Sequence, residues 1–133
     1  MPAPKTALLV EDDPALRDML CKTLQRAGFT VVTAVHGVDA LVQMRSLSAD
    51  VVVTDILMPE MDGFELIRTL HAKWPHLPIV AMSGIDDTPN FRNQALKCGA
   101  KAALSKPVNR AHLVEVMRDI IRADPMSGRA AQA

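Results

Sequence analysis

Short apolar runs alternate with amphipathic segments along most of the chain. The runs are rich in valine, isoleucine, leucine and alanine and show little polar alternation, which is typical of strands buried on both faces of a parallel sheet. They lie at residues 5–10, 29–34, 51–54, 79–82 and 102–104. The pattern predicts a strand at each of these places, and the last is the weakest.

Between the runs, apolar residues recur three or four positions apart, which is the spacing of one helix face. The first helix carries Leu16, Leu20 and Leu24 and is expected to end before Gly28, a typical C-terminal glycine. Further helices are predicted at residues 39–47, 64–74, 89–98 and 113–121. Thr88 in front of the fourth helix and Gly99 behind it are expected to cap it.

Regular alternation of strands and helices predicts the α/β class, with a doubly wound five-stranded parallel sheet and right-handed crossovers. Residues 1–123 are expected to form one domain, because 133 residues leave no room for a second core. Residues 124–133 are mostly small or polar and contain Pro125 and Gly128, so a flexible tail or the stub of a linker is expected there.

Composition excludes several classes of protein. Lys plus Arg and Asp plus Glu both number 15, so no overall basic field would attract nucleic acid. Neither a signal peptide nor an apolar run long enough for a membrane span is seen, and a cytoplasmic protein without membrane contact is expected. Cys21 and Cys98 lack metal-binding or redox spacing and are interpreted as reduced thiols that serve as small hydrophobic residues. The four histidines also lack ligand spacing.

Acidic residues follow two of the predicted strands. Glu11, Asp12 and Asp13 come after the first strand, and Asp55 comes after the third. Glycines that would cradle a dinucleotide or a nucleotide phosphate are absent from this first turn, whereas carboxylates suit Mg²⁺. Asp13 needs no ligand to explain it, because aspartate before Pro14 is typical of a helix N-cap.

The ends of the first and third strands are expected to be neighbours in a parallel sheet. Glu11, Asp12 and Asp55 would then lie within a few ångströms of one another. Like charges at such distances raise at least one carboxyl pKa unless a cation neutralises them. The sequence therefore predicts a metal site at this edge of the sheet.

Two other strand ends carry groups that bind phosphate. Ser83-Gly84 follows the fourth strand and Ser105-Lys106-Pro107 follows the fifth. Taken alone, Ser83-Gly84 is typical of a turn, and Lys106 is typical of a solvated surface lysine. At the carboxyl edge of the sheet, however, the Ser83 hydroxyl and the Lys106 ammonium would converge on Asp55, where they would bind two oxygens of a phosphoryl group while a metal bound a third.

These motifs together resemble the receiver domain of two-component response regulators, in its stand-alone, chemotaxis-like form, over about residues 5–122. The matching residues, in the family's order and spacing, are Glu11-Asp12, the string from Asp55 to Gly63, Ser83-Gly84 and Lys106-Pro107. The resemblance implies a flavodoxin-like (βα)5 fold. It also implies a signalling protein that is not a turnover enzyme.

The resemblance also assigns roles around Asp55, which it identifies as the aspartate phosphorylated by a partner histidine kinase or phosphotransferase. Mg²⁺ would be bound directly by Asp12, by Asp55 and by the backbone carbonyl of Leu57, with Glu11 acting through a water. Ser83 matches the switch hydroxyl, and Lys106 matches the lysine that contacts the phosphoryl group. The Lys106-Pro107 bond is expected to be cis, which is cheap only before proline.

The chain departs from the family pattern at two positions. Ala103 stands where a tyrosine or phenylalanine is usual, and Val108 stands where phenylalanine is frequent. Because alanine has no ring to swing inward, the signal is expected to pass through the loop after the fourth strand or through the surface of the fourth helix, fifth strand and fifth helix, where a downstream protein would dock. Leu57 and Ile85 are apolar where a side chain would position the attacking water, so a long-lived aspartyl phosphate is expected.

The leading hypothesis is therefore a single-domain response regulator that accepts a phosphoryl group on Asp55 with Mg²⁺ as cofactor. A phosphorelay intermediate and a receiver-like module that docks without phosphorylation remain alternatives. A phosphohydrolase with Asp55 as nucleophile is disfavoured, because Leu57 stands where a general acid would be expected.

Overall fold

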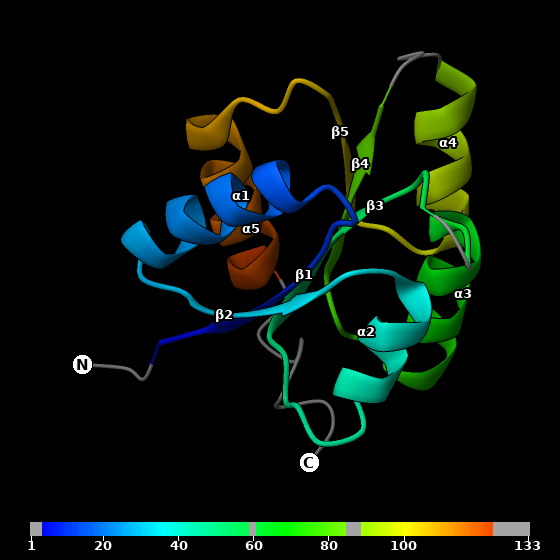
Figure 1. Ribbon diagram of the computed structural model, residues 1–133. Helices are drawn as coiled ribbons and strands as arrows, with labels where there is room; N and C mark the ends of the chain where they lie inside the picture. Colours follow the sequence, from blue (N-terminus) through cyan, green and yellow to red (C-terminus); the bar gives the residue numbers. More distant parts are fainter. Residues whose placement is uncertain (1–3, 59–60, 85–88, 124–133) are drawn as a thin grey trace.

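The structure is a computed structural model that describes residues 4–58, 61–84 and 89–123. Its centre is a parallel five-stranded sheet with the strand order β2-β1-β3-β4-β5, flanked by five helices (Figure 1). The strands are β1 (Thr6–Val10), β2 (Thr30–Ala34), β3 (Val51–Asp55), β4 (Ile79–Ser83) and β5 (Ala102–Ser105). The helices are α1 (Pro14–Arg26), α2 (Gly37–Gln43), α3 (Gly63–Lys73), α4 (Pro89–Cys98) and α5 (Arg110–Ala123). The predicted doubly wound, flavodoxin-like (βα)5 fold is confirmed.

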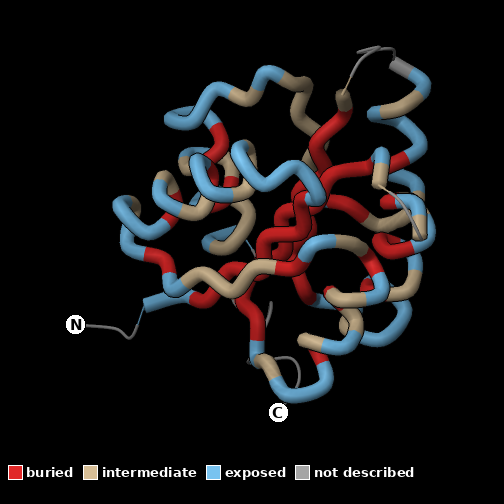
Figure 2. The backbone as a smooth tube through the Cα atoms, viewed as in Figure 1, coloured by how far each residue is buried: buried red, intermediate tan, exposed pale blue. Residues whose placement is uncertain are grey.

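Helices cover both faces of the sheet and create two separate cores. In Figure 1, α1 and α5 lie on one face, and α2, α3 and α4 lie on the other. Alternate residues of the strands serve the two cores: Leu8 and Val52 face α2, α3 and α4, whereas Leu9 and Val53 face α1 and α5. All four of these side chains are fully buried, and burial is concentrated in the central strands (Figure 2). Burial on both faces explains why the strands read as continuous apolar runs.

Capping residues set the ends of α1 as expected. The Asp13 carboxylate accepts a hydrogen bond from the backbone N–H of Ala15 at 3.0 Å, and Pro14 occupies the first helical position. Gly28 follows the helix with a φ of +101°, a conformation that other residues rarely adopt. Gly99 ends α4 in the same way, with a φ of +125°. The predicted cap at Thr88 lies outside the described residues.

The second helix differs from the prediction. It spans Gly37–Gln43 rather than residues 39–47. It begins earlier because Nδ1 of His36 accepts a hydrogen bond from the Asp39 N–H at 3.1 Å, which makes His36 the N-cap. It ends earlier because Ser46 N–H donates to the Gln43 carbonyl three residues back, which is the tighter bond of a turn. Leu47 still packs against the core without being helical.

The other elements differ from their predicted bounds by a few residues at most. The predicted tail at residues 124–133 lies outside the described residues. None of the helices in the described ranges combines the length and the apolar character needed to span a bilayer. Cys21 and Cys98 are both free thiols and both half-buried.

Candidate functional site

The strand order brings Glu11, Asp12 and Asp55 to one edge of the sheet. β1 and β3 are hydrogen-bonded neighbours, with Val10 opposite Thr54, so the chain leaves both strands at the same level. One carboxylate oxygen from each of the three acids lies within 4.8 Å of the other two. Glu11 and Asp55 are buried and Asp12 is exposed. The predicted meeting of acids from separate loops is therefore present.

Lys106 reaches the same cluster from β5, two strands away. Its ammonium nitrogen Nζ lies 3.0 Å from Oδ2 of Asp55 and 3.1 Å from Oε1 of Glu11. Its backbone N–H donates to the carbonyl of Ser83 at 2.8 Å, which fixes the end of β5 against the end of β4. The Lys106-Pro107 bond is cis, as expected. Lys106 thus forms two ion pairs with buried carboxylates.

Burial and charge shift two pKa values in the cluster. Burial of Glu11 raises the pKa of its carboxyl, and the negative charge of Asp55 adds to this rise, although the Asp13 N–H and Lys106 oppose it. Burial by itself would lower the pKa of Lys106, but its hydrogen bonds and charge pairs with Asp55 and Glu11 outweigh burial and raise it. The ammonium is therefore held in its charged form by the carboxylates that it neutralises.

Asp55 has one free oxygen. While Oδ2 binds Lys106, Oδ1 is buried and has no hydrogen-bond partner among the residues that the structure describes. An unpaired buried carboxylate oxygen is costly unless another group binds it. A divalent cation could bind this oxygen, because hard cations prefer carboxylate oxygens and three carboxylates meet at the site. The donor set fits Mg²⁺, which would be held by Asp12 and Asp55.

Ser83 and Leu57 lie at the same edge of the sheet. Ser83 is buried at the end of β4, next to the end of β3. Leu57 is two residues beyond Asp55 and its side chain is half exposed. Ala103 is half-buried on β5 and packs against the core shared with α2, α3 and α4. Ile85 lies outside the described residues.

Two residues at the site were missed by sequence reasoning. Gly63, named above only as the end of the matching string, donates its N–H to the carbonyl of Ile56 at 2.7 Å, and a Cβ there would lie 2.6 Å from the carbonyl oxygen of Asp55. Arg17 donates from Nη1 to the carbonyl of Glu11 at 2.9 Å and holds the turn after β1. The Asp62-Gly63 pair in the sequence could have pointed to Gly63. Nothing in the sequence pointed to Arg17, because an arginine in the first turns of a helix is common.

The fold and the site together define an α/β domain that gathers carboxylates and a lysine at the carboxyl ends of its parallel strands. The family follows from comparison with known proteins. Residues 7–118 match the family described as the response regulator receiver domain, and the chain belongs to that family.

Several characterised proteins are similar to this chain. The C4-dicarboxylate transport transcriptional regulatory protein DctD of Rhizobium meliloti is 34% identical, over all of this chain and 30% of its own length. Response regulator MprA of Mycobacterium ulcerans is 36% identical, over 86% of this chain and 49% of its own. The solved structure of chemotaxis protein CheY4 of Vibrio cholerae is 30% identical, with a TM-score of 0.83 over 89% of this chain and 99% of its own.

Membership of the family carries general properties. Receiver domains are signalling modules of two-component systems, bind Mg²⁺ at an acidic pocket, and interact with histidine kinases and downstream effectors. The chain spans about a third to a half of the length of the curated relatives named here.

Proposed function

We propose that this chain is the receiver domain of a response regulator and that it accepts a phosphoryl group on Asp55 from a histidine kinase or phosphotransferase. The observation that carries the proposal is the state of the Asp55 carboxylate. One oxygen is held by Lys106 at 3.0 Å, and the other is buried and unpartnered among the described residues, beside Asp12 and Glu11. This carboxylate is fixed in place and keeps an oxygen available for a new bond.

In the proposed reaction, an Asp55 oxygen forms a bond to phosphorus as the phosphorus–nitrogen bond of a phosphohistidine breaks, and the imidazole keeps the bonding electron pair. Lys106 stabilises the transferred oxygens by charge, and the Ser83 hydroxyl donates a hydrogen bond to one of them. Asp12, Asp55 and the Leu57 carbonyl would hold Mg²⁺, with Glu11 acting through a water, and the ion would offset negative charge on the carboxylates and the phosphoryl group.

The phosphorylated domain is proposed to dock a downstream protein through the surface of α4, β5 and α5. Moving a two-state equilibrium from about 1:99 to 99:1 needs roughly 5.5 kcal/mol, which a few charge-assisted hydrogen bonds can supply. Ala103 cannot contribute a moving ring. Phe91 of α4 stacks on Phe64 of α3, with ring centroids 5.8 Å apart, so a movement of α4 would be shared with α3.

Two related functions use the same domain. A phosphorelay intermediate would pass the phosphoryl group onward to a histidine, and the geometry of Asp55 suits either role. A module that docks without phosphorylation is favoured only by Ala103, whereas the intact set of acids, hydroxyl and lysine supports phosphorylation. Direct binding to nucleic acid is not proposed, because the formal net charge is zero.

Incubation with Mg²⁺ and a small phosphodonor such as acetyl phosphate, followed by intact mass measurement, tests the proposal. The wild type should gain one phosphoryl group and Asp55→Asn should gain none. Asp119→Asn is the matched control, because Asp119 is an exposed aspartate on α5, and it should behave like the wild type. An unmodified wild type, or equal modification of Asp55→Asn, would contradict the proposal.

A further inference from the structure

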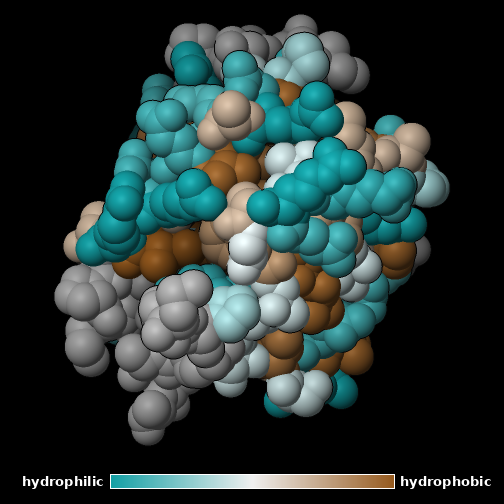
Figure 3. Space-filling view, turned by 90° about the vertical axis from the view of Figure 1, so that its left-hand side faces the viewer, coloured by the Kyte–Doolittle hydropathy of each residue, from teal (hydrophilic) through white to brown (hydrophobic). Residues whose placement is uncertain are grey.

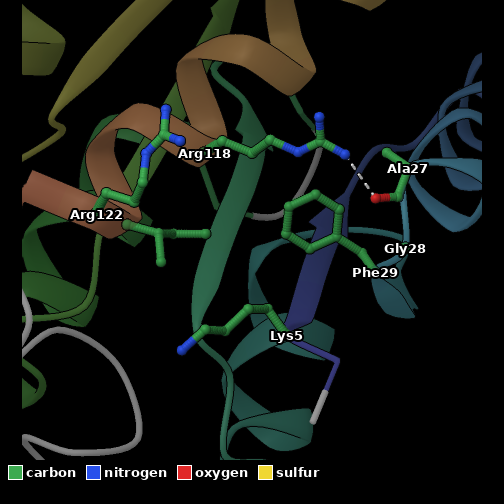
Figure 4. A pocket seen from close by; sticks show the side chains of 7 residues that line it. Lys5, Ala27, Gly28, Phe29, Arg118 and Arg122 are labelled. Atoms are coloured by element: carbon green, nitrogen blue, oxygen red, sulfur yellow. Dashed lines mark hydrogen bonds between the residues drawn. The ribbon is translucent and has the colours of Figure 1, made fainter. Parts of the chain in front are cut away.

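A hollow lies at the opposite edge of the sheet from the acidic site. It has a volume of about 240 Å³ and is formed where the segment before β1, the turn between α1 and β2, and the last turns of α5 meet. The lining residues are Lys5, Ala27, Gly28, Phe29, Arg118, Ile121 and Arg122 (Figure 4). Nothing in the proposed phosphorylation of Asp55 uses this hollow.

The hollow combines an apolar wall with cationic side chains. Phe29 and Ile121 supply apolar surface, and Phe29 lies between Arg118 and Lys5 in Figure 4. Three of the seven described lining residues are cationic and none of them is acidic. Arg118 and Arg122 stand one helical turn apart on α5, so both can reach the same hollow.

The positive charges are only partly neutralised by the protein. Nη2 of Arg118 donates to the Ala27 carbonyl at 2.9 Å, a neutral acceptor at the end of α1. Nη2 of Arg122 lies 2.7 Å from an Asp119 oxygen, but both side chains are more than half exposed, so this pair is weak. Lys5 has no ion pair among the described residues. Among the lining residues, positive charge is therefore in excess beside the apolar wall.

The surroundings favour a small ligand over a protein segment. Its volume of about 240 Å³ lies just below the usual range of drug-sized sites, which suits one small organic molecule better than an extended segment of chain. The exposed large hydrophobic residues of the described chain are Met19, Val35, Val38, Val42, Leu57 and Leu96, and none of them lines the hollow. The face formed by α1 and α5 is mainly hydrophilic, with smaller hydrophobic patches (Figure 3). It therefore lacks the broad apolar centre of a stable protein interface.

We propose that this hollow is a binding site for a small amphipathic organic anion. An aromatic or aliphatic body of the ligand would pack on Phe29 and Ile121, and its carboxylate, sulfonate or phosphate would be held by Arg118, Arg122 and Lys5. The site is separate from Asp55, so Asp55→Asn should bind the ligand as the wild type does. Failure of phosphorylation would leave this proposal intact, and the reverse also holds.

The test uses the full chain and two fluorescent probes of similar aromatic bulk. These are 8-anilinonaphthalene-1-sulfonate, which is anionic, and N-phenyl-1-naphthylamine, which is neutral. The anionic probe should bind saturably at one site and shift the backbone NMR signals of Lys5, Phe29, Arg118 and Ile121. The neutral probe should bind at least about tenfold more weakly, since it lacks the group that the cations recognise.

Paired variants separate the site from general charge. The double variant Lys5→Gln, Arg122→Gln should lower the affinity for the anionic probe by about tenfold or more. Lys22→Gln with Lys73→Gln removes the same charge from exposed positions outside the hollow and should leave affinity unchanged.

The proposal is overturned if both double variants lose the same affinity for the anionic probe, or if the two probes bind the wild type equally well. It is also overturned if the NMR shifts map elsewhere or do not saturate. It is also overturned if the hollow's signals shift with protein concentration alone, because a second copy of the chain would then occupy it.

Discussion

Lys106 links two buried carboxylates that would otherwise repel each other. Its ammonium lies about equally far from Asp55 and Glu11, at 3.0 and 3.1 Å, and the side chain remains 22% exposed. A single side chain therefore offsets the cost of burying like charges and also holds the Asp55 carboxylate in position. Both effects should be lost together when the ammonium is removed.

Lys106→Met should lower the free energy of unfolding by about 2 kcal/mol at neutral pH without divalent metal. Removing one partner of a fully buried pair costs roughly 3–5 kcal/mol, and the partial exposure of Lys106 reduces this. Urea unfolding measures the change, and phosphorylation by acetyl phosphate should also slow. Lys101→Met, at an exposed lysine just before β5, is the control. A variant as stable as the wild type would show that the ion pairs contribute nothing.

Leu57→Asn should shorten the lifetime of the aspartyl phosphate by about fivefold. The leucine side chain is half exposed beside Asp55 and cannot orient water, whereas an amide can supply one hydrogen bond, worth roughly 1 kcal/mol. Decay of the phosphorylated form is followed by intact mass after removal of the phosphodonor. Leu96→Asn, at a similarly exposed leucine of α4, should decay like the wild type. Equal decay rates in all three proteins would exclude this explanation.

At the scale of secondary structure, the site depends on how the start of α3 is pressed against the end of β3. Asp62 caps α3 by accepting from the Glu65 N–H at 2.8 Å, and Gly63 donates to the Ile56 carbonyl. A side chain at residue 63 would collide with the Ile56 backbone as well as with the Asp55 carbonyl. The position needs glycine because of this close approach, so the helix start helps to fix Asp55.

Gly63→Ala should therefore destabilise the protein by about 2 kcal/mol or more, because backbone atoms rather than a flexible side chain must move. Gly84→Ala is the matched control: its new Cβ would lie 3.9 Å from Cδ1 of Leu57, the nearest atom among the described residues, and stability should hardly change. Thermal unfolding of both variants makes the comparison. Equal effects of the two substitutions would mean that close packing at residue 63 is not the cause.

At the scale of the whole molecule, the two opposite edges of the parallel sheet carry different groups. β1 and β3 are neighbours although residues 11–50 separate the end of β1 from the start of β3, and the acids lie at the carboxyl ends of both strands. The opposite edge holds the cationic hollow between α5 and the turn after α1. Without metal, the carboxylates at the acidic edge repel one another. Metal binding should therefore raise the free energy of unfolding.

Mg²⁺ should raise the free energy of unfolding of the wild type by about 1.4 kcal/mol at ten times its Kd. Asp12→Asn should lose most of this gain. In the presence of a chelator the variant should be more stable than the wild type by up to about 1 kcal/mol, because one of three like charges within 4.8 Å is gone. Urea titrations with Mg²⁺ and with chelator measure both effects. A metal response that persists in full in Asp12→Asn would remove this residue from the proposed ligand set.

The sequence by itself determined the fold class and most of the helix and strand positions. Continuous apolar runs can be satisfied only by burial on two faces, and caps such as Asp13 and Gly28 act through their own local chemistry. It failed at α2, because a histidine cap and the tight turns after Gln43 depend on local hydrogen bonds that apolar spacing does not encode.

The meeting of Glu11, Asp12, Asp55 and Lys106 at one edge could be expected from the sequence, because the strand ends of a parallel sheet share one edge whatever the details of packing. Only the tertiary structure decided how charge is distributed there. It showed that Lys106 is shared between Glu11 and Asp55, that Oδ1 of Asp55 is left unpaired within the described chain, and that Gly63 is pressed against the backbone. It also brought Lys5, Phe29 and Arg118 together in one hollow. Such contacts join residues far apart in the chain, so their distances follow from packing and not from any local pattern.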